Sequence, residues 1–147
     1  MSKGFYAIGI YHPKSEVNVG TLWRSAMIFG ASFIFTVGNR YRRQASDTPN
    51  VPNQLPYFSF LSMNDLKEHL PYSCPLIGVE LDPRALMLSE FSHPKRACYL
   101  LGAEDHGLPP VVLQACNSVI KLPGTFSMNV SVAGSIVCYD RLTRGTS

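Results

Sequence analysis

The 147-residue sequence lacks a hydrophobic run long enough to cross a membrane. Its first apolar stretch, Phe5–Tyr11, is short and is followed by charged residues, so it does not resemble the core of a signal peptide. We therefore expect no membrane segment and a cytoplasmic protein. The sequence also lacks a strong charge of one sign, because its formal net charge is only +3. This charge permits an anionic partner without requiring one.

Paired cysteine motifs are absent as well. The four cysteines are Cys74, Cys98, Cys116 and Cys138, and no two of them form a C-x-x-C pair. Each lies in an apolar stretch, which favours buried free thiols over a metal site or a disulfide framework. We expect no metal.

What the sequence does have is enough apolar residues for a core, at 46%, arranged in runs of alternating type. The patterns predict strands at Phe5–Tyr11, Ser32–Gly38, Tyr57–Leu61, Pro75–Leu81, Ala97–Leu101 and Ser118–Leu122. They predict helices at Asn18–Gly30, Ser62–Leu70, Pro110–Cys116 and Met128–Leu142, and a loop at Asn39–Pro56. This alternation indicates one α/β domain over residues 1–147, with a mostly parallel sheet and helices on both faces. Ligands of such sheets bind beyond the carboxyl ends of the strands.

The first segment with unusual polar residues reads NVGTLWRSAMIFGAS. Asn18 is predicted to cap the helix, and Gly20 allows another backbone to approach closely. Arg24 is out of place in so apolar a helix. It is either a functional residue or a structural one, with its stem along the apolar surface or its charge in an ion pair.

The second segment, LLGAEDHGLPP, follows a predicted strand. Gly102 and Gly107 suit a tight turn that holds backbone near a ligand, and Glu104 is a candidate partner for Arg24. An ordinary strand–helix turn is the alternative. The segment is not G-x-G-x-x-G, so a dinucleotide-binding oxidoreductase is not supported.

The third segment, LPGTFSMNVSVAG, leads from a strand into the last predicted helix. Ser127 suits an ordinary helix N-cap, whereas Asn129, expected in the first turn, has no such structural role. The free backbone N–H groups at a helix start also suit an anion or a carboxylate.

Together the three segments resemble the signature blocks of the SpoU/TrmH branch of the SPOUT superfamily of RNA methyltransferases. That branch shows N-x-G-x-x-x-R, G-x-E-x-x-G-L and S-(L/M)-N-(V/L)-S-x-A, in this order. Here the blocks read NVGTLWR from Asn18 to Arg24, GAEDHGL from Gly102 to Leu108, and SMNVSVA from Ser127 to Ala133. Each block is modest alone, but three in order are specific.

The resemblance implies an α/β fold whose C-terminal segment forms a deep trefoil knot. It implies that S-adenosyl-L-methionine binds in the knot and that the protein is a homodimer. The implied activity is 2′-O-methylation of a ribose in RNA, with tRNA favoured over rRNA. The alternative is a knotted RNA-binding module without methyl transfer.

The resemblance also assigns residues. It places the cofactor against Val79, Glu80, Gly102, Leu122, Ser127 and Met128. It implies a catalytic set of Arg24, Asn18, Glu104, Ser127 and Asn129. The family arginine has been assigned as general base, but a guanidinium has no acceptor and stays protonated in proteins. We therefore expect Arg24 to hold a phosphate and to lower the pKa of the ribose hydroxyl electrostatically.

The chain carries a basic stretch, GNRYRRQ, in its predicted loop. Arg40, Arg42 and Arg43 suit phosphates, and Tyr41 suits stacking on an exposed base, so we expect RNA to contact this loop. A solvated basic loop is the alternative. His106 is either a site residue or a structural one.

Overall fold

The computed structural model describes residues 4–38, 55–103, 105–124 and 128–147. Within these ranges the strands are β1 (Phe5–Tyr11), β2 (Phe33–Val37), β3 (Tyr57–Phe60), β4 (Leu76–Val79), β5 (Leu86–Met87), β6 (Arg96–Gly102) and β7 (Ser118–Lys121). The helices are α1 (Glu16–Ile28), α2 (Met63–Glu68), the 3-10 turn η2 (Leu88–Glu90), α3 (Pro110–Ala115) and α4 (Val130–Arg144). No helix among the described residues is both long enough and apolar enough to span a membrane.

The strands form one seven-stranded sheet in the order β3-β2-β1-β6-β4-β7-β5. Every strand pairing in it is parallel, as the alternation of elements predicted. The chain winds from β1 toward β3 on one side, and the later strands lie on the other side. The junction of β1 and β6 is therefore the switch point of the sheet, beyond whose carboxyl ends ligands of such folds bind.

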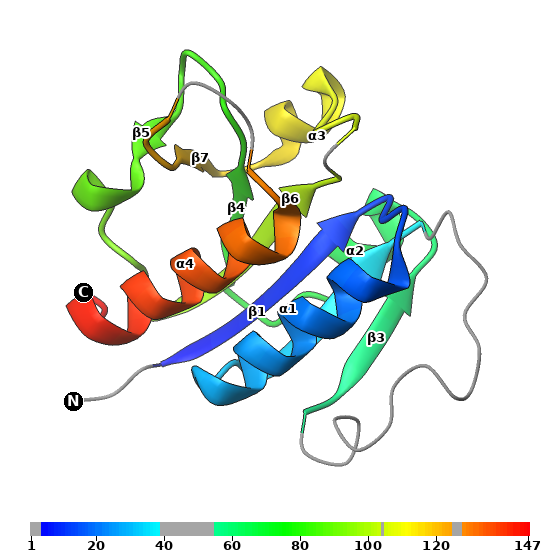
Figure 1. The fold of residues 1–147 in the computed structure, drawn as a ribbon, viewed down its shortest axis with the longest axis horizontal. Coiled ribbons are helices and arrows are strands. Elements are labelled where there is room, and N and C mark those ends of the chain that lie inside the picture. The colour runs from blue at the N-terminus through cyan, green and yellow to red at the C-terminus, as the bar shows by residue number, and fades with distance from the viewer. Residues whose placement is uncertain (1–3, 39–54, 104, 125–127) are drawn as a thin grey trace.

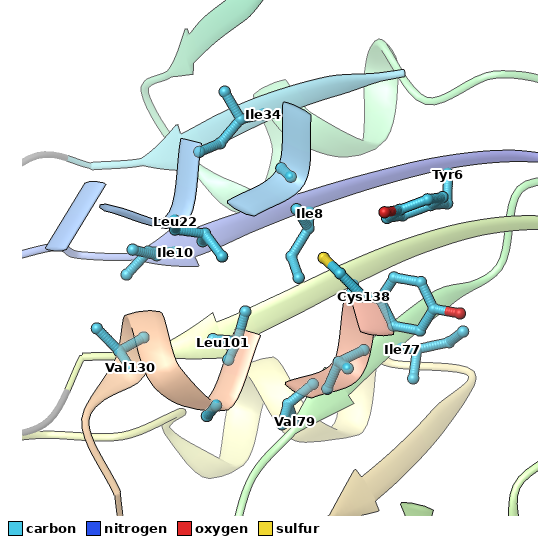
Figure 2. Close-up of a cluster of buried hydrophobic side chains, with 14 of the residues drawn as sticks. Tyr6, Ile8, Ile10, Leu22, Ile34, Ile77, Val79, Leu101, Val130 and Cys138 are labelled. Atoms are coloured by element: carbon cyan, nitrogen blue, oxygen red, sulfur yellow. The ribbon is translucent and has the colours of Figure 1, made fainter. Parts of the chain in front are cut away.

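Helices cover both faces of the sheet, which confirms the sequence prediction. α1 and α4 pack side by side on one face (Figure 1). Side chains alternate along a strand, so Tyr6, Ile8 and Ile10 of β1 all point to this face. They meet Leu22 of α1 and Cys138 of α4 in the larger core (Figure 2).

The opposite face is covered by the shorter helices α2 and α3. Leu66 of α2 and Val112 of α3 are buried there. They pack with Ala7 of β1 and Leu100 of β6, whose side chains point to this second face of the sheet. Cys98 and Cys138 are buried and Cys74 and Cys116 are half-buried, and all four are free thiols, as predicted. Parallel strands of this kind need both faces covered, which explains their nearly continuous apolar runs.

Local side-chain contacts hold several of these elements in place. Ser62 caps α2 by accepting from the N–H of Asp65 at 3.1 Å. Asp65 accepts from the N–H of Leu61 at 2.9 Å, one residue before the capping serine. Trp23 belongs to the core and donates from Nε1 to the carbonyl of Leu55 at 3.0 Å.

Two cap predictions are wrong. Ser15, not Asn18, caps α1, by accepting from the N–H of Val17 at 3.1 Å. Asn129, not Ser127, caps α4, so Asn129 has the structural role that the sequence prediction denied it. Serine and asparagine are nearly equal as caps, so propensity alone could not choose between nearby candidates.

Two elements were not predicted. β5 has two residues and η2 has three, both too short to show a periodicity. The predicted loop at Asn39–Pro56 lies largely outside the described residues.

Candidate functional site

A cavity of about 270 Å³ opens beyond the carboxyl ends of β4, β6 and β7. It is lined by Val79, Glu80, Leu81, Leu101, Gly102, Ala103, Asp105, His106, Gly107, Lys121, Leu122, Pro123, Met128, Val130 and Ala133. These residues come from three strand ends and from the start of α4. Most of the lining side chains are apolar, while backbone groups and the side chains of Glu80, Asp105, His106 and Lys121 make the exposed wall at least as polar as apolar.

Five of the six residues predicted to hold the cofactor line this one cavity. They are Val79, Glu80, Gly102, Leu122 and Met128. The sixth, Ser127, lies outside the described residues. Residues more than 40 positions apart in sequence are thus brought together around one cavity.

The glycines of the second block shape the turn after β6. Gly107 has a φ of +65°, a conformation that residues with a Cβ rarely adopt, and its N–H donates to the carbonyl of Ala103 at 2.7 Å. A Cβ on Gly102 would lie only 2.3 Å from the carbonyl carbon of Gly107. Both glycines are therefore required by a tight turn beside the cavity, which confirms that prediction. Glu104 lies outside the described residues.

Glu80 joins this turn to the end of β4. Its Oε1 accepts from the N–H of Leu108 at 2.9 Å. A Cβ on Gly107 would lie 2.9 Å from both carboxylate oxygens. Burial raises the pKa of Glu80, while the N–H of Leu108 opposes that rise. A half-buried carboxylate on an apolar wall offers an acceptor to a ligand hydroxyl or a cationic group.

A second cavity, of about 540 Å³, lies beside the first. It is lined by Ile10, Pro13, Lys14, Ser15, Asn18, Ala103, Asp105 and Val130. Ala103, Asp105 and Val130 line both cavities. Two molecules bound in these cavities would therefore lie next to one another, at the switch point between β1 and β6.

Two of the predicted catalytic residues meet at the second cavity. Asn129 donates from Nδ2 to Oδ1 of Asn18 at 3.1 Å, although the two residues are 111 positions apart. Oδ1 of Asn129 accepts from the N–H groups of Ser131, at 3.0 Å, and Val132, at 3.2 Å. The hydroxyl of Ser131 donates to the same oxygen at 2.5 Å. This network joins the first turn of α1 to the first turn of α4.

Arg24 lies elsewhere on α1. It is exposed and shares the outer stripe of the helix with Val17, Thr21 and Ile28. Arg24 is not among the residues that line either cavity. Its predicted pairing with Glu104 falls on a residue outside the described ranges. The structure thus brings Asn18 and Asn129 together but leaves Arg24 facing outward.

Of the charged residues around the cavities, Glu80 and Lys121 are half-buried, whereas Lys14, Asp105 and His106 are exposed. Lys14 Nζ lies 3.9 Å from Asp105 Oδ2, and His106 Nε2 lies 3.5 Å from the same oxygen. Arg40, Arg42 and Arg43, the predicted RNA contacts, lie outside the described residues. Within the described ranges, no cluster of three or more His, Cys, Asp or Glu side chains is placed to hold a metal ion.

Sequence reasoning missed two residues of this region. Ser131 was quoted in the third block but given no role, and its buried hydroxyl contacts Asn129. Asp105 lies in the second block and lines both cavities. Both were within recognised motifs, so the signal was present, but only the fold shows what their side chains contact.

Solved structures of the same fold include SpoU methyltransferases. The chain superposes with a TM-score of 0.84 and 19% identity on AviRb from Streptomyces viridochromogenes in complex with AdoMet, covering 98% of this chain and 59% of that one. A structure concerning 2-OH methylation of C/U34 on tRNA gives a TM-score of 0.83 and 19% identity, covering 97% of this chain and 99% of the other.

Two curated relatives are longer than this chain. The 23S rRNA (guanosine-2'-O-)-methyltransferase RlmB of Acinetobacter baylyi is 25% identical over 135 residues, covering 84% of this chain and 53% of the relative. The tRNA (guanosine(18)-2'-O)-methyltransferase TARBP1 of Mus musculus is 27% identical over 139 residues, covering 84% of this chain and 8% of the relative. The chain thus spans about half of the first relative and a small part of the second.

A sequence model of the SpoU rRNA Methylase family matches residues 6–139, nearly the whole chain. The matched region includes all three signature blocks, both cavities and the network between α1 and α4. The chain belongs to the SpoU methylase family.

Proposed function

We propose that this protein is an S-adenosyl-L-methionine-dependent RNA methyltransferase that modifies a ribose 2′-hydroxyl, with residues 1–147 acting as one SPOUT-type domain. The observation that carries the proposal is the pair of adjoining cavities, which share Ala103, Asp105 and Val130. One suits the methyl donor and the other suits the acceptor nucleotide. In-line transfer requires these two molecules to lie side by side.

The residues of the smaller cavity fit the cofactor. Apolar side chains of Val79, Leu122 and Met128 suit an adenine ring, and Glu80 offers an acceptor to hydroxyl or ammonium groups. When bound, S-adenosylmethionine supplies a methyl group that is already activated by the positive sulfonium. The task left to the protein is to hold the hydroxyl in line and to stabilise the oxygen as it loses its proton.

The residues of the larger cavity fit a nucleotide. Lys14 brings a positive charge to its rim, and the amide of Asn18 lies on its wall. We assign phosphate binding to Arg24 and to the basic stretch that contains Arg40, Arg42 and Arg43. Glu104 and Ser127 complete the proposed catalytic set, and Ser127 also belongs to the proposed cofactor set. The assignments of Arg24, Glu104 and Ser127 follow from the family blocks, and those of Arg40, Arg42 and Arg43 follow from the basic residues of their stretch.

We propose that the protein acts as a homodimer through the outer face of α1 and α4. A groove of about 310 Å³ there is lined by Thr21, Phe29, Ser131, Val132, Ser135, Ile136 and Tyr139. Its apolar side chains Val132, Ile136 and Tyr139 are exposed, as are Val17 and Ile28 nearby. A partner on this face would cover them, and it would lie beside Arg24. Light scattering that gives a monomer would contradict this assembly.

The trefoil knot is part of the same proposal. β7 lies between β4 and β5, although β5 directly follows β4 in the chain. Residues 80–85 must therefore cross β7 to reach β5. This arrangement supports a C-terminal segment threaded through a loop. The cytoplasmic location stays a prediction.

Transfer RNA is the favoured substrate. The tRNA-related neighbour matches this chain over 99% of its own length, which means that the two proteins are of similar size. Ribosomal RNA is the next candidate, because one curated relative is a 23S rRNA methyltransferase.

The test is transfer of tritiated methyl from S-adenosylmethionine to bulk tRNA and, separately, to rRNA, both from cells that lack the protein. Label recovered on a 2′-O-methyl nucleoside is expected, and it should be lost in Arg24→Ala while cofactor binding remains. Label on a base would contradict the ribose assignment. Absence of both label and cofactor binding would favour an RNA-binding module.

A further inference from the structure

A row of large side chains lies at the amino ends of four neighbouring strands, on the face of the sheet that α2 and α3 cover. In the order of the sheet the row reads Phe58 of β3, Phe33 of β2, Phe5 of β1 and Arg96 of β6. Each of the four stands two residues before a member of the core beneath α2 and α3, so all four side chains point to that face. The ring centroids of Phe5 and Phe33 are 6.0 Å apart, and those of Phe33 and Phe58 are 5.1 Å apart. We call these four residues the amino-end row.

The amino-end row is at least partly exposed, whereas the next residues of the same face are buried. Phe58 is 48% exposed, and Phe60, two residues further along β3, is 8% exposed. Phe33 and Phe5 are half-buried and Arg96 is exposed, although the next residue of this face is fully buried in each of their strands. Scattered exposed apolar side chains are ordinary, but rings that contact one another across three strands form a patch of the kind that marks a binding surface.

A positive charge stands at one end of this patch. Arg96 is paired with Phe5 in the register of β1 and β6, and its Nη1 donates to the carbonyl of Tyr72 at 2.8 Å. This contact holds the side chain and uses one of the five N–H donors of a guanidinium, so others can reach a ligand. Lys95, the preceding residue, is a second exposed cation. The two charges complement an anion, and a guanidinium suits a phosphate in particular.

We propose that the amino-end row binds an unpaired segment of the RNA substrate, with bases stacked on its rings and a phosphate on Arg96. The inference rests on the proposed function and adds a second RNA contact to it. Every base has a flat aromatic face, so rings bind single strands of any sequence while cations follow the phosphates. The ring planes differ by 90° between Phe33 and Phe58 and by 60° between Phe5 and Phe33. A continuous base stack does not lie flat on rings tilted in this way, so the row suits the separated bases of a single strand and not a duplex.

The amino-end row is remote from the two cavities. β1 and β6 are each 7 residues long. At about 3.3 Å per residue, the row and the carboxyl ends of the strands are therefore about 20 Å apart. One nucleotide cannot reach both places, so the row contributes to RNA affinity and not to methyl transfer itself. The proposed dimer contact is on the other face of the sheet, over α1 and α4, and leaves the row accessible.

The decisive variant is Phe58→Leu, which keeps an apolar side chain on β3 but removes the ring. Binding of a short fluorescein-labelled oligouridine, followed by fluorescence anisotropy, should weaken about tenfold, the effect of losing one stacked base. Phe58→Tyr keeps a ring and should bind within twofold of the wild type. Leu61→Thr is the matched control, because it alters a still more exposed apolar residue, just beyond the other end of β3, and should leave binding unchanged.

Arg96→Gln tests the same surface without altering the packing of the rings. It should weaken oligouridine binding and lower the slope of log Kd against log salt by about one, because one phosphate contact is lost. In methylation assays with tRNA, Phe58→Leu should raise KM about tenfold and leave kcat and the cofactor Kd within twofold. Thermal unfolding confirms that each variant is folded.

The outcomes separate the inference from its alternatives. Equal oligouridine affinity in Phe58→Leu, Arg96→Gln and the wild type, or an equal loss in Leu61→Thr, would overturn the inference. Unchanged RNA affinity with a changed oligomeric state of Phe58→Leu in light scattering would also overturn it, and would assign the face to a second copy of the chain. A wild type that methylates no RNA would contradict the proposed function instead, and the oligouridine comparison would still decide whether the row binds RNA.

Discussion

Helix α4 is anchored at both ends by polar networks, and the two networks are built in opposite ways. At its start, Asn129 contacts Asn18 beside two open cavities, and both amides are at least partly exposed. At its end, Arg141 and Asp140 meet His93 and Tyr99 in a cluster in which Arg141 and the His93 side chain are buried. The first network lies at the carboxyl ends of the strands and the second at their amino ends.

The buried network is nearly saturated with contacts. Arg141 donates to the carbonyls of Pro94, at 2.7 Å, and Lys95, at 2.9 Å, and to the hydroxyl of Tyr99 at 3.0 Å. His93 joins Tyr99 at 2.6 Å to Asp140 at 2.7 Å. We propose that similar polar chemistry serves stability where water is excluded and ligand binding where a cavity adjoins it. The following predictions test this division.

The largest effect is expected for Arg141→Met, which removes a buried charge together with its hydrogen bonds to two carbonyls. Those carbonyls and the Tyr99 hydroxyl would lose their donor, so the free energy of unfolding should fall by about 3 kcal/mol. Urea denaturation measures this loss. The folded fraction should bind S-adenosylmethionine as tightly as the wild type. A large loss of cofactor affinity with unchanged stability would reverse the proposed roles of the two ends.

Glu80→Gln tests the cavity at the carboxyl ends of the strands. The amide oxygen of glutamine still accepts from the N–H of Leu108, so the turn is retained while the negative charge is removed. Losing a charged hydrogen-bond partner should weaken S-adenosylmethionine binding about tenfold in calorimetry. Asp82→Asn, which removes a nearby carboxylate that does not line the cavity, should leave the affinity unchanged. Burial raises the pKa of Glu80, so its carboxylate takes up a proton at a higher pH than an ordinary glutamate does. As the pH is lowered, wild-type affinity for S-adenosylmethionine should therefore begin to fall at that higher pH.

The pH dependence of stability tests the buried network at the amino ends of the strands. Burial lowers the pKa of His93 in the folded protein, although Asp140 opposes this shift. Asp140 only accepts, so Nε2 of neutral His93 donates to it and Nδ1 accepts from Tyr99, which itself accepts from Arg141. Protonation of Nδ1 would break the Tyr99 contact. Arg141 and Arg144 also disfavour a second positive charge.

The sign of the effect follows from this shift. The unfolded chain takes up the His93 proton at a higher pH than the folded protein, so stability is complete above about pH 6.5 and falls as the pH drops below it. The slope should not exceed about 1.4 kcal/mol per pH unit from this one group. Urea denaturation between pH 5 and 8 measures it. His93→Gln should flatten the slope, and an unchanged slope would contradict the assignment.

The smallest effect is expected for Ser135→Ala. It removes a hydroxyl contact between α1 and α4 that lies between the two networks, at a cost of about 1 kcal/mol of unfolding free energy. Thermal unfolding measures that cost, and methyl transfer should not change. A loss of methyl transfer in this variant would mean that the whole contact between α1 and α4 affects the activity, and not only the part beside the cavities.

Much of the fold could be predicted from the sequence, because its core strands are continuous apolar runs. β1 was predicted at Phe5–Tyr11, and its bounds are confirmed. That Val79, Glu80, Gly102, Leu122 and Met128 lie around one cavity was indicated only by the resemblance to the family blocks. No local pattern could place Val79 beside Leu122, since their contact depends on β7 pairing with β4.

What could not be predicted depends on long-range contacts. The contact of the Ser131 hydroxyl with Asn129 depends on where α4 begins. The burial of Arg141 had no signal in the sequence either, because an arginine in the last turn of a helix is usually exposed. Its hydrogen-bond acceptors lie more than 40 positions away.

The central claim is that cofactor binding belongs to the carboxyl end of the sheet and stability to its amino end. Amide hydrogen exchange with and without S-adenosylmethionine tests it most directly, because it reports on both ends in one experiment. We expect protection in residues 79–81, 101–108 and 121–123, and no change in residues 88–96 and 140–147. Protection confined to residues 88–96 and 140–147, or no protection anywhere at saturating cofactor, would contradict the account.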